Sequence, residues 1–179
     1  KLSAAAQHLH IASLFDLSLI LSQTVSSTPF SVPSLYLPKL EHVSEAQFWN
    51  EALLQAEQFL GLPQNTIKVC LQIETFQGLL NADALLYALH QRAYGLNAGR
   101  WDYVFSLTKH LGQSHQTALP ARRSLTMQQD AMQAYAEQLV RICHLRGAEA
   151  IGGTAAVAPD PAQPQAALEA VRADKEREA

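Results

Sequence analysis

Short apolar runs alternate with longer segments of helical periodicity along most of this chain, and no other feature constrains its fold as strongly. The runs have the length of strands, while the segments between them place apolar side chains three or four positions apart. Repeated strand–helix units predict a parallel sheet whose strands are joined by crossover helices. We predict five strands, at residues 8–15, 35–38, 67–74, the start of 94–106, and 148–152. We predict helices at residues 16–26, 45–60, 76–90, 102–109 and 129–146, and a last one from residue 165.

Local signals mark the ends of the two longest helices. Ser44, with Gln47 three residues later, has the spacing of a capping box at a helix start. Gly61 and Gly147 follow the helical segments and predict where they end. The apolar faces of these two helices, which we expect to be buried, include Phe48, Leu53, Phe59, Tyr135, Leu139 and Val140.

Two α/β architectures fit this alternation, the open doubly wound sheet and the (β/α)8 TIM barrel. No Gly-x-Gly-x-x-Gly follows the first predicted strand, which argues against a dinucleotide-binding sheet. A complete barrel needs about 250 residues, whereas this chain has 179. We therefore expect an incomplete TIM barrel of five strand–helix units. A start at Lys1 and a charged helix at the other end fit a chain that is cut at both ends.

Composition excludes several kinds of partner. The net charge is −3 and the pI is about 6.2, which argues against nucleic acid or an anionic membrane surface. The apolar run Leu14–Leu21 contains Asp16 and is too short to span a membrane. Cys70 and Cys143 lie far apart inside apolar segments, as reduced thiols of a cytosolic protein do. We therefore expect a cytoplasmic protein.

Polar residues follow three of the predicted strands. Glu74 ends the third strand, Gly99–Asp102 follows the fourth, and Gly152–Thr154 follows the fifth. The carboxyl ends of parallel strands meet at one edge of a sheet, where active sites of such folds lie. Glycines let backbone N–H groups approach an anion, and two carboxylates suit Mg²⁺. Since these positions carry neither His nor Cys, zinc is not expected.

Each of these residues taken alone has a plainer structural interpretation. Glu74 fits a solvated or capping carboxylate, and Asp102 fits a helix N-cap. Arg100 fits a surface cation and Trp101 a core anchor. Only the combination of a glutamate, a glycine turn and an aspartate at neighbouring strand ends predicts a site.

Seven stretches of the chain form recognisable motifs: Leu37–Glu41, Trp49–Asn50, Gln72–Thr75, Gly95–Tyr103, Cys143–Ala148, Ala150–Gly153 and Val171–Lys175. In this order and spacing they resemble malate synthase of the A type, and the resemblance covers residues 13–179. Its most specific motif is Gly-Leu-Asn-x-Gly-Arg-Trp-Asp-Tyr at Gly95–Tyr103.

The resemblance implies that residues 1–179 are the central part of a TIM-barrel domain, without the first part of the barrel and without a C-terminal domain. The resemblance also implies an acyltransferase of the glyoxylate cycle, which shares steps with the tricarboxylic acid cycle. The family condenses acetyl-CoA with glyoxylate and water to give malate and CoA, and it uses Mg²⁺. On the matching motifs, Glu74 and Asp102 would be the two magnesium ligands. The turn formed by Gly99, Arg100, Trp101 and Asp102 would hold glyoxylate. No oligomeric state is implied.

The chain also departs from the family pattern. The family's catalytic arginine would lie before Lys1 and its catalytic aspartate after Ala179, so we expect the chain alone to be inactive. Residues 42–47 differ from the usual sequence after Glu41, and Thr154 stands where Met is usual. Two alternatives therefore stay open. One is a non-catalytic structural or interaction module, and the other is a related barrel lyase that acts on acyl-CoA thioesters. The Gly-Arg-Trp-Asp motif argues against the lyase.

Overall fold

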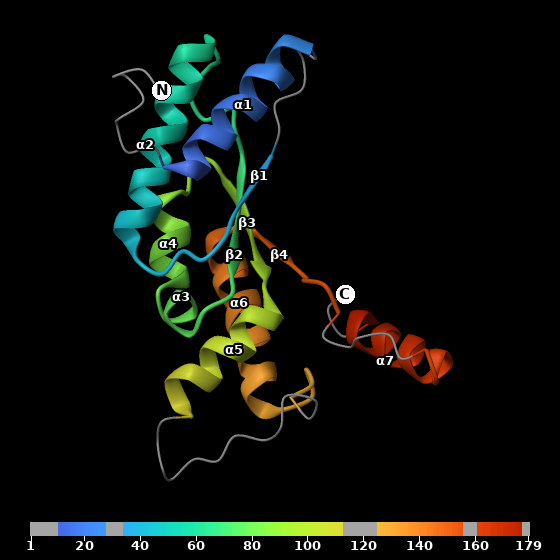
Figure 1. Cartoon of the computed structure of the whole chain (residues 1–179). Helices are drawn as coiled ribbons and strands as arrows, with labels where there is room; N and C mark the ends of the chain where they lie inside the picture. Colours follow the sequence, from blue (N-terminus) through green and yellow to red (C-terminus); the bar gives the residue numbers. More distant parts are fainter. Residues whose placement is uncertain (1–10, 28–33, 113–124, 156–160, 177–179) are drawn as a thin grey trace, which may run out of the picture.

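A four-stranded parallel sheet forms the centre of the molecule (Figure 1). The computed structural model describes residues 11–27, 34–112, 125–155 and 161–176. The strands are β1 (Leu35–Leu37), β2 (Val69–Ile73), β3 (Ala93–Ala98) and β4 (Glu149–Ile151), and they pair in chain order. A doubly wound sheet reverses its strand order, whereas the wall of a barrel does not. The fold is therefore an incomplete TIM barrel.

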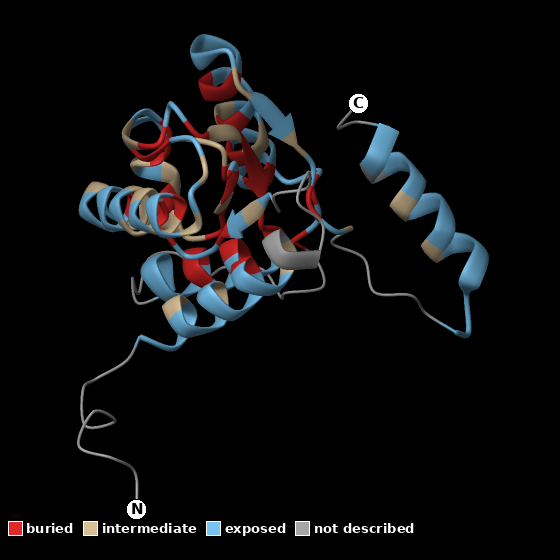
Figure 2. Cartoon of the chain, turned by 90° about the horizontal axis from the view of Figure 1, so that it is seen from above, coloured by how far each residue is buried: buried red, intermediate tan, exposed pale blue. Residues whose placement is uncertain are grey.

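Helices cover one face of this sheet. α2 packs on α4, α4 packs on α6, and α6 contacts β3 and β4. Figure 2 shows the buried residues gathered between these helices and the sheet, while α7 is largely exposed. α7 contacts the loop after β4 through Lys175, whose ammonium donates to the Gly153 carbonyl. The helices are α1 (Ala12–Ser27), α2 (Val43–Leu60), α3 (Phe76–Leu80), α4 (Ala82–Ala88), α5 (Arg100–Leu111), α6 (Asp130–Arg146) and α7 (Pro164–Glu176).

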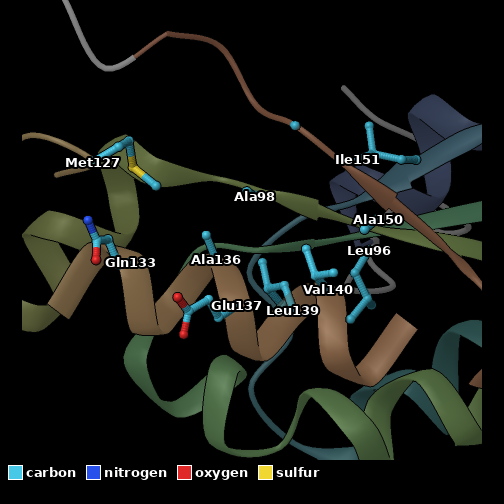
Figure 3. Close-up of a pocket in the computed structure, with 11 residues that line it drawn as sticks. Leu96, Ala98, Met127, Gln133, Ala136, Glu137, Leu139, Val140, Ala150 and Ile151 are labelled. Atoms are coloured by element: carbon cyan, nitrogen blue, oxygen red, sulfur yellow. The ribbon is translucent and has the colours of Figure 1, made fainter. Parts of the chain in front are cut away.

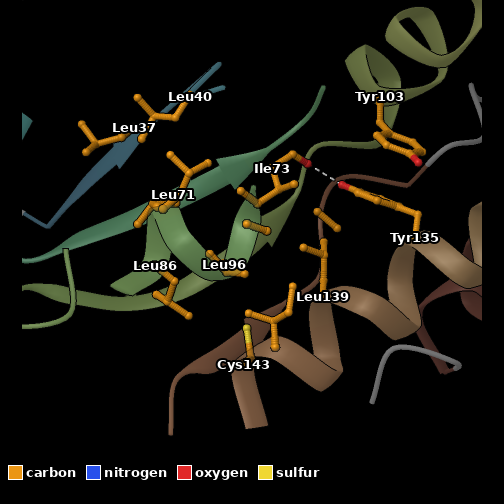
Figure 4. Packing of buried hydrophobic residues seen from close by; sticks show 14 of the residues in the cluster. Leu37, Leu40, Leu71, Ile73, Leu86, Leu96, Tyr103, Tyr135, Leu139 and Cys143 are labelled. Carbon is orange, nitrogen blue, oxygen red and sulfur yellow. Dashed lines mark hydrogen bonds between the residues drawn. The ribbon is translucent and has the colours of Figure 1, made fainter. Parts of the chain in front are cut away.

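Strand register explains why the two faces of the sheet differ. Leu37, Leu71 and Leu96 pair in one row, and each is buried in the core under the helices (Figure 4). Side chains alternate between faces along a strand, so Gln72 and Asn97, which also pair, point the other way. The apolar core therefore lies on the helix side, and polar side chains remain on the opposite side.

The predicted first strand is wrong over the part that the structure describes. Residues 12–15 open α1, so the described residues contain four strands and not five. Leu14, Leu17 and Leu21 have helical spacing and are among the less exposed residues of α1, with Leu21 fully buried. Because α1 packs on α2, this stripe has a surface to cover. The predicted strand residues 8–10 lie outside the described residues.

Several other predictions change in detail. α2 has its N-cap at His42 and not Ser44, and the Glu45 carboxylate accepts the N–H groups of Glu41 and His42, both at 2.8 Å. Gly61 and Gly147 end their helices with left-handed φ of 67° and 66°, as predicted. The predicted helix at 76–90 is divided into α3 and α4. Three residues on the expected apolar faces are exposed, namely Phe48 (45%), Phe59 (91%) and Val140 (40%).

Cys70 and Cys143 are buried free thiols. None of the helices that the structure describes combines the length and the apolar character needed to cross a membrane. The sequence also predicts a polar, irregular segment at 112–125 and a proline-rich loop at 157–164. Most of the first and part of the second lie outside the described residues.

Candidate functional site

Two carboxylates from neighbouring strand ends meet at a single ammonium group. Glu74 directly follows β2, and Asp102 lies in the first turn of α5, just after β3. Lys39, two residues beyond β1, places its Nζ 2.6 Å from Asp102 Oδ2 and 3.4 Å from Glu74 Oε1. The structure therefore brings together the two residues that the sequence predicted as metal ligands.

Glu74 is held at both of its oxygens. Oε1 accepts the backbone N–H of Lys39 at 3.0 Å, and Oε2 accepts the Gln72 side-chain amide at 3.0 Å. The Glu74 side chain is 3% exposed, whereas that of Asp102 is 51% exposed. One carboxylate is therefore fixed and buried, while its neighbour faces solvent.

The pKa values of the two carboxyl groups are shifted in opposite directions. Burial raises the pKa of Glu74, and its hydrogen bond with Asp102 adds to the rise, against the charge of Lys39. Hydrogen bonds with Lys39 and Glu74 lower the pKa of Asp102 in spite of some burial. Burial alone would lower the pKa of Lys39, but the hydrogen bond to Asp102 and the charges of both carboxylates raise it. The shifts of Asp102 and Lys39 therefore favour the charged forms of both groups, whereas burial of Glu74 opposes its ionisation.

The glycine turn between β3 and α5 lies directly against Glu74. A Cβ added at Gly99 would overlap Glu74 Cβ and would lie 3.0 Å from Gln72 Nε2. The Gly99 N–H donates to the Ile73 carbonyl at 3.1 Å, so it is already used within the sheet. The N–H groups of the first helical turn, at Arg100–Asp102, are the ones that a helix start presents to an anion.

The structure places Arg100 and Trp101 differently from their plain interpretations. Arg100 is 1% exposed, so it is not a surface cation. Trp101 is 44% exposed and donates its indole N–H to the Ala155 carbonyl at 3.2 Å, so it is not a core anchor. Both residues instead lie beside the loop that follows β4, since Trp101 bonds to Ala155 and Arg100 Nε would lie 3.9 Å from a Cβ added at Gly153. Gly153 also approaches the Ala98 carbonyl so closely that no Cβ would fit there.

A polar cavity of about 390 Å³ opens beside this cluster. The Asn97 side-chain amide donates to the Gly152 carbonyl at 3.3 Å and joins the ends of β3 and β4. Thr154, one of the departures from the family pattern, lies in the cavity wall. The lining residues are Tyr36, Gln72, Asn97, Ala98, Gly99, Gly152, Gly153 and Thr154.

A second cavity, also of about 390 Å³, lies between α6 and the strands β3 and β4 (Figure 3). Its wall is mostly apolar and includes Met127, Leu139 and the half-exposed Val140. Its polar side chains, Gln133 and Glu137, both come from α6. Because charged groups from several elements converge beside the polar cavity and not here, the polar cavity is the candidate site.

The donor set suits a hard cation. Glu74 and Asp102 offer carboxylate oxygens that already contact one positive group. Within the described parts of the chain, no group of three or more His, Cys, Asp or Glu side chains gathers as a metal site. Two carboxylates fit a cation that keeps water or substrate oxygens at its other positions, as Mg²⁺ does.

Lys39 and Gln72 were not identified from the sequence as part of this site. Lys39 has a signal in the sequence, since it follows a predicted strand just as Glu74 and Asp102 do. Gln72 also has a signal in the sequence, because it lies two positions before Glu74 and therefore on the same face of the predicted strand. Tyr135 was expected only to be buried, and its contact with Ile73 depends on the packing of α6.

Comparison with known proteins supports a single family. The family model of the malate synthase TIM-barrel domain matches residues 6–179. A malate synthase of Streptomyces clavuligerus is 49% identical over 151 residues, which are 82% of this chain and 28% of that protein. A glyoxysomal malate synthase of Gossypium hirsutum is 41% identical over 149 residues, or 82% of this chain and 26% of that protein. The chain thus spans about a quarter of the length of these relatives.

Solved structures agree on the fold. A citrate lyase of Burkholderia xenovorans superposes with a TM-score of 0.65 at 21% identity, over 92% of this chain and 54% of that one. A malate synthase of Haloferax volcanii, solved as a pyruvate/acetyl-CoA ternary complex, gives 0.64 at 14% identity, over 94% and 43%. At these identities the structures establish the barrel fold, and the family rests on the sequence matches. By those matches, this chain belongs to the malate synthase family and corresponds to part of its TIM-barrel domain.

Proposed function

We propose that this chain provides the glyoxylate and Mg²⁺ half of a malate synthase active site, where acetyl-CoA condenses with glyoxylate and water to give malate and CoA. The observation that carries this proposal is the convergence of Glu74 and Asp102 on one positive group beside the start of α5. Membership of the malate synthase family supports the reaction class.

In this proposal Glu74 and Asp102 hold the cation. The Lys39 N–H and the Gln72 amide keep the Glu74 carboxylate in one orientation, so little conformational freedom is lost when a cation binds. Asp102 is exposed and completes the pair from the solvent side. Bound Mg²⁺ would polarise the aldehyde oxygen of glyoxylate as a Lewis acid.

The carboxylate of glyoxylate would bind at the start of α5. The N–H groups of Arg100, Trp101 and Asp102 belong to the first turn, and the positive end of a helix dipole favours an anion there. The buried Arg100 side chain, whose Nε lies near Gly153, adds positive charge beside the polar cavity. The polar cavity, with Thr154 in its wall, would hold the rest of the substrate.

Condensation needs two further groups, a base that takes a methyl proton from acetyl-CoA and a cation that stabilises the enolate. We assign neither to this chain and propose that other parts of the enzyme supply them. The 179-residue chain alone would then bind the cation and glyoxylate without forming malate. We propose a cytoplasmic location, which two buried free cysteines support.

Cation binding tests the proposal directly. Mn²⁺, a paramagnetic substitute for Mg²⁺, is titrated into the chain, and free Mn²⁺ is followed by electron paramagnetic resonance. We expect saturable binding by the unaltered chain and at least about tenfold weaker binding by Glu74→Gln and Asp102→Asn, since each removes a charged ligand. Asp83→Asn, which changes an exposed carboxylate on α4 paired with Arg146, is the control and should bind normally.

Glyoxylate is then titrated with and without Mg²⁺, and tighter binding with Mg²⁺ is expected. Absence of saturable Mn²⁺ binding by the unaltered chain, or equal binding by the Glu74 and Asp102 variants, would refute the proposal. A folded chain that binds neither ligand would favour a purely structural module.

A further inference from the structure

We propose that Tyr135 is a positioning residue of the cation site, because its side chain contacts the neighbours of both carboxylates and holds them in register. The inference rests on the proposed function, since it assigns a role within the same site. Tyr135 lies on α6, on the helix side of the sheet, and belongs to none of the motifs that point to the site.

The first contact is with the end of β2. The Tyr135 hydroxyl donates to the Ile73 carbonyl with an oxygen–oxygen distance of 2.5 Å (Figure 4). Ile73 directly precedes Glu74, and the same carbonyl accepts the Gly99 N–H at 3.1 Å. One carbonyl oxygen therefore joins α6, the strand that ends at Glu74 and the turn that leads to Asp102.

The second contact is with the start of α5. The ring of Tyr135 stacks on that of Tyr103, with centroids 3.9 Å apart and planes 13° from parallel. Tyr103 directly follows Asp102 in the chain. Tyr135 thus touches the residue before one carboxylate and the residue after the other, from a single rigid position.

The hydroxyl is suited to a lasting role as a donor. Tyr135 is fully buried, and burial raises the pKa of its hydroxyl well above the ordinary value. The group therefore keeps its proton throughout the pH range in which proteins stay folded. A buried side chain that packs on two elements also has few alternative rotamers. Its hydrogen bond accordingly fixes the end of β2 relative to α5.

A variant without this hydroxyl tests the role of the hydroxyl in positioning separately from the role of the ring in folding. Tyr135→Phe keeps the ring and its stacking on Tyr103, and it leaves the Ile73 carbonyl bonded to the Gly99 N–H. Tyr103→Phe is the matched control, because it removes a hydroxyl from the same stack without touching the bond to Ile73. A role in packing alone would affect both variants alike.

The experiment measures Mn²⁺ affinity of the 179-residue chain by electron paramagnetic resonance, well below the thermal midpoint of each variant. Groups that hydrogen-bond a metal ligand directly typically contribute 10–100-fold in affinity. Tyr135 acts one step further away, through the Ile73 carbonyl, so we expect Tyr135→Phe to weaken binding by about three- to tenfold. Tyr103→Phe should change affinity less than about twofold, because it leaves the bond to Ile73 intact. In a Glu74→Gln background, Tyr135→Phe should add little, because the group that it positions is already altered.

The outcomes are distinguishable. If the unaltered chain does not bind Mn²⁺, the proposed function fails and this inference fails with it. If Glu74→Gln weakens binding but Tyr135→Phe binds like the unaltered chain, the inference alone is overturned. Equal weakening by both tyrosine variants would show general packing, and a Tyr135→Phe chain that does not fold would show a structural role. Either result would overturn the inference.

Discussion

Replacing Gly99 with Ala should damage the candidate site without a comparable effect on the rest of the fold. The backbone at Gly99 has φ −81° and ψ 73°, outside the left-handed region that favours glycine. The added methyl group, and not backbone strain, is therefore the perturbation. It would point at the side chains of Glu74 and Gln72, which form the buried wall of the site.

The size of the effect follows from the geometry. The new Cβ would lie 3.0 Å from Gln72 Nε2 and 3.1 Å from Gln72 Cγ, and closer than either to Glu74 Cβ, whereas ordinary contacts begin at 3.4 Å. Gln72 can rotate, but Glu74 Cβ is fixed to the end of β2, so the strand end and the turn must separate. A shift on the order of 1 Å in a preorganised active site can lower the catalytic rate about 100-fold. Overpacking of this kind also costs about 1–3 kcal/mol of folding free energy.

Urea unfolding and Mn²⁺ affinity, each measured for Gly99→Ala and for a control variant, separate the effect on the site from the effect on folding. Gly147→Ala meets no atom within 4 Å, but φ there is 66°, so an alanine is strained by about 1–2 kcal/mol. Urea unfolding should therefore show similar losses for the two variants. Mn²⁺ affinity should fall at least about tenfold for Gly99→Ala, while Gly147→Ala, which lies at the end of α6, should leave it unchanged. Normal Mn²⁺ affinity in Gly99→Ala would refute the reasoning that this close approach sets the geometry of Glu74.

Two further predictions concern folding. Burial alone would raise the pKa of Glu57, but hydrogen bonds from Arg92 and from the N–H groups of Ile67 and Asn65 lower it. Its stabilisation is thus complete above the ordinary carboxyl pKa, about 4.3, and is lost as pH falls through the lower folded value. Glu57→Gln should flatten the acid limb of unfolding free energy against pH, and it should cost about 3–5 kcal/mol at neutral pH, because Arg92 stays buried. An unchanged acid limb would contradict this. Leu53→Ala should cost about 2–5 kcal/mol in urea unfolding, whereas Phe59→Ala, at 91% exposure on the same helix, should cost less than about 0.5 kcal/mol. Equal costs would contradict the burial pattern.

The candidate site was predictable where it depends on strand direction alone. Glu74 and Asp102 each follow a buried strand, and parallel strands in sequential order bring their carboxyl ends to one edge. The prediction that the two carboxylates meet therefore needed only the positions of two strands. Lys39 was missed although the same rule applies to it, because a lysine after a strand is an ordinary surface residue until its partners are known.

The errors have a common cause. Residues 12–15 are apolar enough for a strand, but α1 forms because its leucine stripe packs on α2. Phe59 has the periodicity of a buried residue but lies on the part of α2 that nothing in the described chain covers. The sequence pattern indicates which residues share one side of a helix. Whether that side is buried depends on which other element packs against it.

The sequence by itself determined the strand–helix alternation and the helix ends at Gly61 and Gly147, because these depend on neighbours within a few residues. It also determined the motif at Gly95–Tyr103 and the family, because these depend on a specific order of residues. Tertiary structure alone decided that Lys39 contacts both carboxylates and that the Tyr135 hydroxyl reaches the Ile73 carbonyl. Those contacts join residues 35 to 63 positions apart. Their distances depend on sheet register and helix packing, and no local pattern in the chain encodes either of these.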